Sequence, residues 1–213
     1  VRPQDEAVTS AYSTAVKSGV VKKFTLPGSY DDMSYSMKYL EISEIWGNVF
    51  GRENLSVFPI HKSDGGVKDV VRDFSEAAGI DGESLFYGRS DNQSLDVHKI
   101  WLLRGINLHL KLFEGSEFNK MRARIVSSLE RTPALGPTVM ASSEERQRLL
   151  DCCAPSNSAM FEKYCGIGNL FDKIQQEKPP VDVPENVNAD LLFKMISDLF
   201  RDYDKNYVPT EKR

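Results

Sequence analysis

The chain has 213 residues, of which 40% are apolar, and its 27 Lys and Arg against 31 Asp and Glu give a net charge of −4. A chain of this length buries roughly 70% of its unfolded surface on folding, so it needs neither a disulfide framework nor a structural metal to form a core. The composition excludes collagen-like, fully disordered and small disulfide-knot proteins. No strongly basic stretch is available to neutralise successive phosphates, which argues against nucleic-acid binding.

Membrane and redox signals are also weak. Apolar runs are only a few residues long, far below the roughly 18 of a membrane span, and no signal-peptide pattern opens the chain. Cys152, Cys153 and Cys165 lack the spacing of a metal site. We therefore expect a cytoplasmic protein with reduced thiols. Cys152 and Cys153 then serve as small apolar side chains in a helix, and a redox pair is the less favoured alternative.

Two helices are predicted in the first 50 residues. One covers Asp5 to Ser18, where apolar residues recur at spacings of three and four until Gly19 ends the pattern. The second covers Ser34 to Phe50. We expect one face of it to lie in the core: Tyr35, Tyr39, Ile42, Trp46, Val49 and Phe50.

The segment from Leu55 to Ile60 is the clearest strand, because it is short, apolar and bounded by Asn54 and by a glycine-containing turn. The following pattern predicts an amphipathic helix from Val67 to Ala78 that ends at Gly79. We expect Val70 and Phe74 to belong to its buried face.

The rest of the chain is predicted to be helical. Helices are expected near Asp96 and near Ser116, from the capping box at Ser142, from Ser156 to Tyr164 and from Ala189 to Tyr203. Residues 175–187 contain three prolines and few apolar side chains, so they are the best linker candidate, and residues 188–213 then form a terminal amphipathic helix and tail.

The chain itself is thus predicted to be predominantly α-helical, with one or two short strands. A single strand does not form a sheet. Either Leu55 to Ile60 is an isolated extended segment, or it pairs with strands that precede Val1. Because the chain begins with Val rather than Met, we favour a longer parent protein.

Self-contained catalysis has no obvious motif here, since no phosphate loop, dinucleotide fingerprint, zinc-protease motif or nucleophile elbow occurs. The stretch Gly65-Gly66-Val67-Lys68 resembles a helix start that binds an anion. A turn between a strand and a helix also needs glycine, so we favour a purely structural role for these residues. His61 follows the predicted strand, where ligand sites of α/β proteins gather. His98 and His109 lie about 16 Å apart along one helix, which excludes a shared metal, and we expect no metal site.

Arg2 and Ser10 have a spacing that suits a phosphate. Arg2 precedes a helix and Ser10 lies in that helix, so a guanidinium and a hydroxyl are able to converge on one anion. Alternatively, Arg2 only precedes the helix, Ser10 is one of its polar residues, and neither side chain binds a ligand.

Several segments in this order resemble bacterial sulfotransferase-like proteins that are associated with polysaccharide biosynthesis. The resemblance spans roughly residues 1 to 172 and leaves out the last helix. The segments that carry it are Val1 to Glu6, Ser10 to Tyr12, Val16 to Gly19, Ile45 to Val57, Gly66 to Ile80, Asn92 to Leu95, Leu102 to Asn107, and Glu145 to Leu170-Phe171.

The resemblance implies a P-loop-type α/β fold, with residues 1–174 as the carboxyl-terminal part of the domain. It implies transfer of a sulfuryl group from 3′-phosphoadenosine 5′-phosphosulfate (PAPS) to a carbohydrate hydroxyl. Arg2 and Ser10 match the pair that holds the 3′-phosphate of this donor. The family's phosphosulfate loop precedes this segment, so we expect the chain alone to be inactive.

Three positions depart from the family pattern. Pro3 replaces a frequent second Arg, Phe58 replaces an Arg, and His61 replaces an acid. These departures leave open a relative that has kept the fold and lost the activity. The alternative from another class is a non-catalytic helical interaction domain. The sequence does not specify the acceptor, the catalytic base or the oligomeric state.

Overall fold

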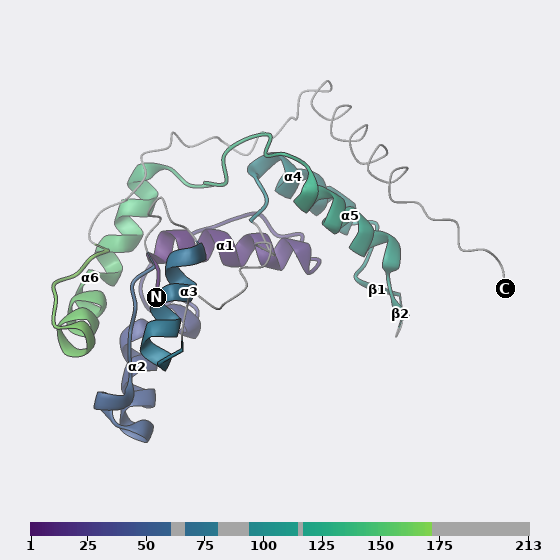
Figure 1. Ribbon diagram of the computed structural model, residues 1–213. Helices are drawn as coiled ribbons and strands as arrows, with labels where there is room; N and C mark the ends of the chain where they lie inside the picture. Colours follow the sequence, from purple (N-terminus) through teal and green to yellow (C-terminus); the bar gives the residue numbers. More distant parts are fainter. Residues whose placement is uncertain (61–66, 81–93, 115–116, 172–213) are drawn as a thin grey trace. The chain divides into compact units, whose positions relative to one another are not determined.

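A computed structural model of the protein describes residues 1–60, 67–80, 94–114 and 117–171 (Figure 1). This part of the chain holds six α-helices and one hairpin of two-residue strands. The prediction of a predominantly helical chain is therefore confirmed. The predicted linker (residues 175–187) and the predicted terminal helix lie outside the described residues.

The chain divides into two compact units. The first contains residues 1–8, 25–91 and 141–179, and the second contains residues 9–24, 92–140 and 180–213. Helix α1 (Gln4–Lys17) belongs to both, because the division falls between Val8 and Thr9. Among the described residues, no helix is long and apolar enough to cross a membrane.

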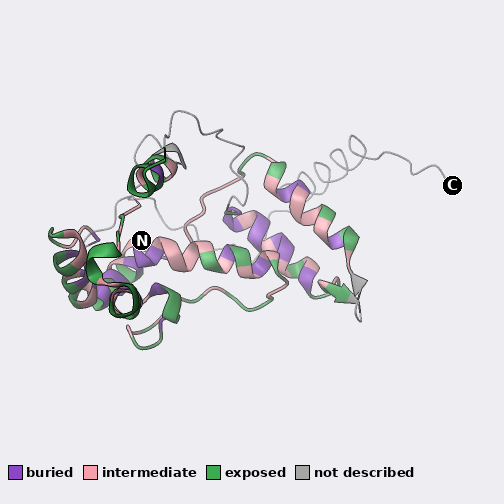
Figure 2. Cartoon of the chain, turned by 60° about the horizontal axis from the view of Figure 1, so that its bottom comes forward, coloured by how far each residue is buried: buried purple, intermediate pink, exposed green. Residues whose placement is uncertain are grey.

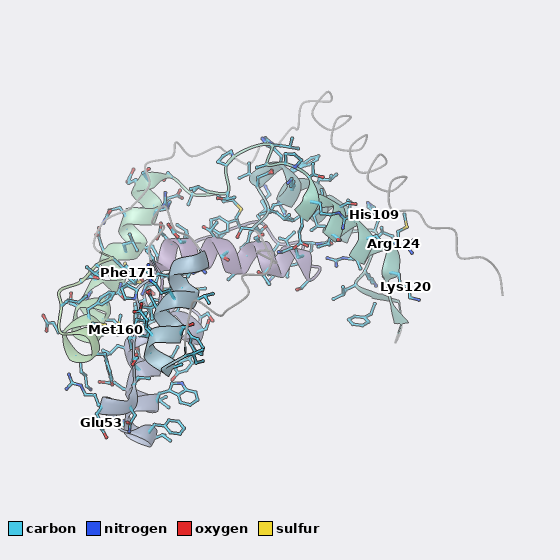
Figure 3. The ribbon with its side chains drawn as sticks, in the orientation of Figure 1. Glu53, His109, Lys120, Arg124, Met160 and Phe171 are labelled. Carbon is cyan, nitrogen blue, oxygen red and sulfur yellow. The ribbon has the colours of Figure 1, made fainter. Side chains whose placement is uncertain are left out.

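The first unit contains α2 (Tyr39–Phe50), α3 (Val67–Ala78) and α6 (Ser143–Cys165), with 3₁₀ turns at Tyr35–Met37 and Arg52–Asn54. Buried residues occur along α6 and at the start of α1 (Figure 2). They form two clusters, of which one contains Met33, Met37, Leu149 and Cys153, and the other contains Tyr39, Met160, Phe161 and Phe171. Met160 and Phe171 are labelled in Figure 3.

The second unit contains the rest of α1, α4 (Val97–Asn107), α5 (Lys120–Arg131) and the hairpin of β1 (Phe113–Glu114) and β2 (Glu117–Phe118). The two strands are antiparallel, with Phe113 opposite Phe118. The buried core of this unit comprises Val16, Leu95, Ile100, Leu102, Leu103 and Leu129.

Buried polar side chains fix the helices of the second unit. Asp96 caps α4, since its Oδ1 accepts hydrogen bonds from the backbone N–H groups of His98 (3.0 Å) and Lys99 (3.1 Å). The buried guanidinium of Arg122 donates to the carbonyls of Val16 (3.1 Å) and Lys17 (2.6 Å). A cation at these last carbonyls also complements the dipole of α1.

The prediction of an apolar role is confirmed for Cys153, whereas Cys152 is exposed. All three are free thiols, and Cys153 is buried with its Sγ 3.3 Å from the sulfur of Met33. Burial raises the pKa of the Cys153 thiol to about 12, so it stays protonated and acts as an apolar side chain.

Helix α6 begins with the predicted capping box. The backbone N–H of Glu145 donates to Ser142 Oγ (3.1 Å), and the backbone N–H of Ser142 donates to Glu145 Oε2 (2.9 Å). The structure corrects the prediction of a separate helix from Ser156, because α6 continues through Pro155 to Cys165. Buried Cys153 and Asn157 flank the exposed Pro155 and hold this part of the helix in the unit.

Replacing Ser142 with alanine should lower the free energy of unfolding by about 1 kcal/mol, because α6 loses its N-cap acceptor. Urea unfolding measures this change. Ser143→Ala is the matched control, since Ser143 is the next residue and supplies no cap, and its effect should stay within about 0.5 kcal/mol. Equal effects of the two replacements would contradict the capping role.

The cap also predicts a pH dependence. Hydrogen bonds from Ser142 lower the pKa of the Glu145 carboxyl. The stability that Glu145 contributes is thus complete above its unfolded pKa of about 4.3 and is lost as the pH falls through the lower folded value. Urea unfolding from pH 6 to pH 2.5 should show a smaller loss for Ser142→Ala than for the unchanged protein. An identical pH profile would contradict this assignment.

Two predicted buried faces are wrong. On α2, Tyr39 is buried, but Tyr35, which precedes the helix, and Trp46, Val49 and Phe50 within it are exposed. On α3, whose bounds match the prediction, Phe74 is 64% exposed and Val70 is 40% exposed. Among residues 70–78 of α3, the buried residue is Ser75, whose hydroxyl donates to the carbonyl of Val71 (2.7 Å). In the described part of the chain, no element covers these apolar faces.

The prediction of a strand at Leu55 to Ile60 is not met, because these residues belong to no regular element. Their backbone is nevertheless paired at one point. The α-amino group of Val1 donates to the carbonyl of Phe58 (2.7 Å), and the N–H of Ile60 donates to the carbonyl of Val1 (2.6 Å).

Candidate functional site

The backbone around Arg2 is held in place from both sides. Val1 makes the two hydrogen bonds to the segment of residues 58–60. On the other side, Pro3 accepts the first helical hydrogen bond, from the N–H of Ala7 (3.0 Å), so α1 starts directly after Pro3, two residues beyond Arg2. Arg2 therefore has a fixed position at the amino end of α1.

Buried polar pairs hold the first turn of α1 against α6. The guanidinium of Arg146 contacts Asp5 Oδ2 through Nη2 (2.6 Å) and Nε (2.8 Å). The amides of Gln4 and Asn157 exchange two hydrogen bonds, of 2.7 and 3.0 Å. Neither pair was predicted from the sequence, because Asp5 has only the pattern of an acidic residue in the first turn of a helix. The two pairs fix the end of α1 that follows Arg2. Asp5 is the carboxylate nearest to Arg2 in the sequence, and Arg146 neutralises its charge.

Arg2 differs from the other basic side chains in its surroundings. Among the described residues, the remaining partly or fully buried Lys and Arg side chains all have an acceptor in the protein: Lys17, Lys38, Lys99, Arg104, Arg122 and Arg146. Arg2 is partly buried, and in the described part of the chain its guanidinium makes no ion pair or hydrogen bond. A desolvated cation without an anion is costly, so this position favours a negatively charged ligand.

Ser10 lies within α1 and is partly buried. Arg2 belongs to the first unit and Ser10 to the second. Their convergence on one phosphate therefore stays a prediction.

The other sequence-predicted positions that the structure describes add no further site. His61, Gly65 and Gly66 lie outside the described residues, and Val67 and Lys68 are the first residues of α3. In the described ranges, no group of three or more His, Cys, Asp or Glu side chains is suited to a metal ion. His98 is in the first turn of α4, and His109 follows the end of that helix.

An apolar groove in the first unit was not predicted. It has a volume of about 350 Å³, and its walls come from α2, α3 and the segment that includes Val57 and Phe58. Val1 also lines this groove, and in Figure 1 the amino terminus lies beside α3. The signal in the sequence is the pair of apolar faces on α2 and α3, which were predicted to be buried in the core.

Comparisons with known proteins give no relative. No protein-family model, no curated protein and no solved structure matches the chain. Its function is therefore inferred from its own residues and from the segment-by-segment resemblance described above.

Proposed function

We propose that the chain is part of a P-loop-type sulfotransferase that transfers a sulfuryl group from PAPS to a carbohydrate hydroxyl. In this proposal Arg2 and Ser10 bind the 3′-phosphate of the donor. The observation that carries the proposal is the partly buried guanidinium of Arg2, which has no acceptor among the described residues and sits at the start of α1.

Physical chemistry favours this ligand at Arg2. A guanidinium presents two parallel N–H donors that match two phosphate oxygens, and a serine hydroxyl supplies a further donor. The free N–H groups of a helix amino terminus also favour an anion. The Asp5 carboxylate would oppose such binding, but its ion pair with Arg146 reduces that repulsion.

Sulfuryl transfer needs more than the 3′-phosphate contacts. Charge that develops on the bridging oxygen of the donor must be stabilised, and in the family pattern a Lys in a strand-turn-helix loop does this. No segment of the 213 residues has the spacing of a phosphate loop. We propose that this loop lies elsewhere in the parent protein and that the present chain is inactive alone.

The proposal predicts a binding defect for Arg2→Ala. In the full-length gene product, this replacement should weaken the affinity for adenosine 3′,5′-bisphosphate by about 1.5 to 3 kcal/mol, the usual range for a charged hydrogen bond. Isothermal titration calorimetry measures the change. Arg148→Ala is the matched control, because Arg148 is an exposed residue of α6 in the same unit.

An Arg2→Ala protein that binds the nucleotide as tightly as the unchanged protein would remove the site assignment. Ser10→Ala should produce a smaller loss of affinity, since a neutral hydroxyl contributes less than a guanidinium. If no nucleotide binds to any of these proteins, the non-catalytic interaction domain becomes the better explanation of the chain.

A further inference from the structure

The two segments that build the described part of the second unit are basic, although the chain as a whole is acidic. Residues 9–24 hold three Lys and no acid, and residues 92–140 hold seven Lys and Arg against four Asp and Glu. The net charge of the chain is −4. Charge of one sign that gathers in one part of a molecule creates a local potential, which attracts partners of the opposite sign.

Two of the four acids are neutralised or used inside the unit. Asp96 is buried, where it caps α4, and Glu130 pairs with Lys17 (2.9 Å). The other two acids, Glu114 and Glu117, are the last and first residues of the hairpin strands. Outside these strands, the two segments contain no further acid to balance the exposed cations.

The outward face of α5 is a basic stripe. Lys120, Arg124 and Arg131 are exposed and occupy positions i, i+4 and i+11, so they share one face of the helix. Over these eleven steps the stripe extends about 16 Å at 1.5 Å per residue. Arg122 and Leu129 are buried and face inward. Like charges one helical turn apart repel each other, so an anionic partner would stabilise this face.

The hairpin adds Lys111 to this stripe. The pairing of β1 with β2 continues to the carbonyl of Leu112, which accepts a hydrogen bond from the N–H of Asn119 (2.9 Å). The same register places Lys111 beside Lys120, and both are exposed. Figure 3 labels Lys120 and Arg124 at the end of α5 that adjoins the hairpin. Like charges at neighbouring positions of a hairpin are unfavourable without a counter-charge.

Exposed apolar side chains lie among these cations. Leu108, Phe113 and Met121 are 66%, 51% and 62% exposed. Leu108 follows α4, Phe113 belongs to β1 and Met121 is in the first turn of α5. They therefore belong to the same part of the chain as Lys111 and Lys120. Apolar side chains between cations are typical of proteins that lie on an anionic membrane: the apolar groups enter the headgroup boundary, and the cations meet the lipid phosphates.

We propose that this part of the second unit binds the surface of a membrane that contains anionic phospholipids. The residues of this hairpin surface are Leu108, Lys111, Phe113, Lys120, Met121 and Arg124. The protein lies on the membrane through them and does not cross it. The proposal is independent of nucleotide binding at Arg2.

The apolar side chains favour a membrane over a soluble polyanion such as a nucleic acid. A nucleic acid contacts the cations through its phosphates and stacks its bases on aromatic rings. Leu108 and Met121 offer no ring to a base, so a nucleic acid would leave them in water. A lipid headgroup boundary instead removes them from water and keeps Lys111 and Lys120 at its phosphates.

Vesicle co-sedimentation tests the proposal. The protein should bind vesicles of phosphatidylcholine with about 30% phosphatidylserine at least about tenfold more tightly than vesicles of phosphatidylcholine alone. Raising the NaCl concentration from about 0.1 M to about 0.5 M should weaken this binding, because salt screens the charges. Equal binding to the two kinds of vesicle, or binding to neither, would overturn the proposal.

A charge reversal assigns the binding to the hairpin surface. Arg124→Glu should weaken binding to the anionic vesicles by at least about fivefold, the usual effect of one cation at such a surface. Arg148→Glu is the matched control, because Arg148 is exposed on α6 and its replacement changes the net charge equally. Its binding should stay within about twofold of the unchanged protein. Equal losses in the two variants would show that only net charge matters and would remove the assignment.

Removing an apolar side chain distinguishes a membrane from a nucleic acid. Met121→Ser should weaken binding to the anionic vesicles by about threefold or more, since Met121 no longer enters the headgroup boundary. If this variant bound the vesicles as tightly as the unchanged protein, the apolar contact would be wrong. Binding to a single strand of DNA that Arg124→Glu abolishes, with no binding to vesicles, would identify a nucleic-acid surface and overturn the proposal.

Discussion

Replacing Arg146 with alanine should lower the free energy of unfolding by about 3 to 5 kcal/mol, because the carboxylate of Asp5 then stays buried without its guanidinium. The side chains of Arg146 and Asp5 are 4% and 1% exposed, and their closest atoms are 2.6 Å apart. The pair joins the first turn of α1 to α6, so its loss also loosens the position of Arg2. Urea unfolding followed by circular dichroism measures the effect.

Arg148 provides the matched control for this replacement. It lies two residues further along α6 and is exposed, so Arg148→Ala should change the free energy of unfolding by at most about 0.5 kcal/mol. In the double replacement Arg146→Met with Asp5→Leu, most of the lost stability should return, since no unpaired charge remains buried. A loss below 1 kcal/mol for Arg146→Ala would show that Asp5 is solvated in solution.

The second large effect is expected for Phe161→Ala, which should cost about 3 to 5 kcal/mol of unfolding free energy. Phe161 is fully buried, and its ring meets that of Phe171 edge to face at 5.0 Å between centroids. Both the lost apolar contact and the remaining cavity contribute to this cost.

Phe74→Ala is the informative comparison in the same unit. In the 213-residue chain it should cost less than about 1 kcal/mol, because the Phe74 side chain is largely exposed. The two replacements remove the same group from two surroundings, and urea unfolding compares them directly. If Phe74→Ala were as costly as Phe161→Ala, the exposed position of the α3 face would be wrong.

Most helices were predictable because they have local signals, but the helix expected near Ser116 begins only at Lys120, and α6 is one helix rather than two. The capping box of Ser142 and Glu145 fixed the start of α6, and the pattern from Val67 to Ala78 fixed the bounds of α3. Local patterns do not say what covers an apolar face. Trp46 and Phe74 were assigned to a core for that reason, whereas in the described residues they line a groove.

The surroundings of the candidate site depended on contacts between distant residues. Asp5 and Arg146 are 141 positions apart, and Gln4 and Asn157 are 153 positions apart. Neither pair has a spacing that a sequence pattern detects. Arg2 was proposed from its eight-residue spacing to Ser10, but its lack of an acceptor in the described part of the chain became visible only in the structure.

The central claim is that Arg2 recognises a 3′-phosphate, and calorimetry with two nucleotides tests it most directly. The full-length protein should bind adenosine 3′,5′-bisphosphate at least about tenfold more tightly than adenosine 5′-monophosphate, a difference of about 1.4 kcal/mol. In Arg2→Ala this preference should disappear. Equal affinities of the unchanged protein for the two nucleotides would contradict the claim.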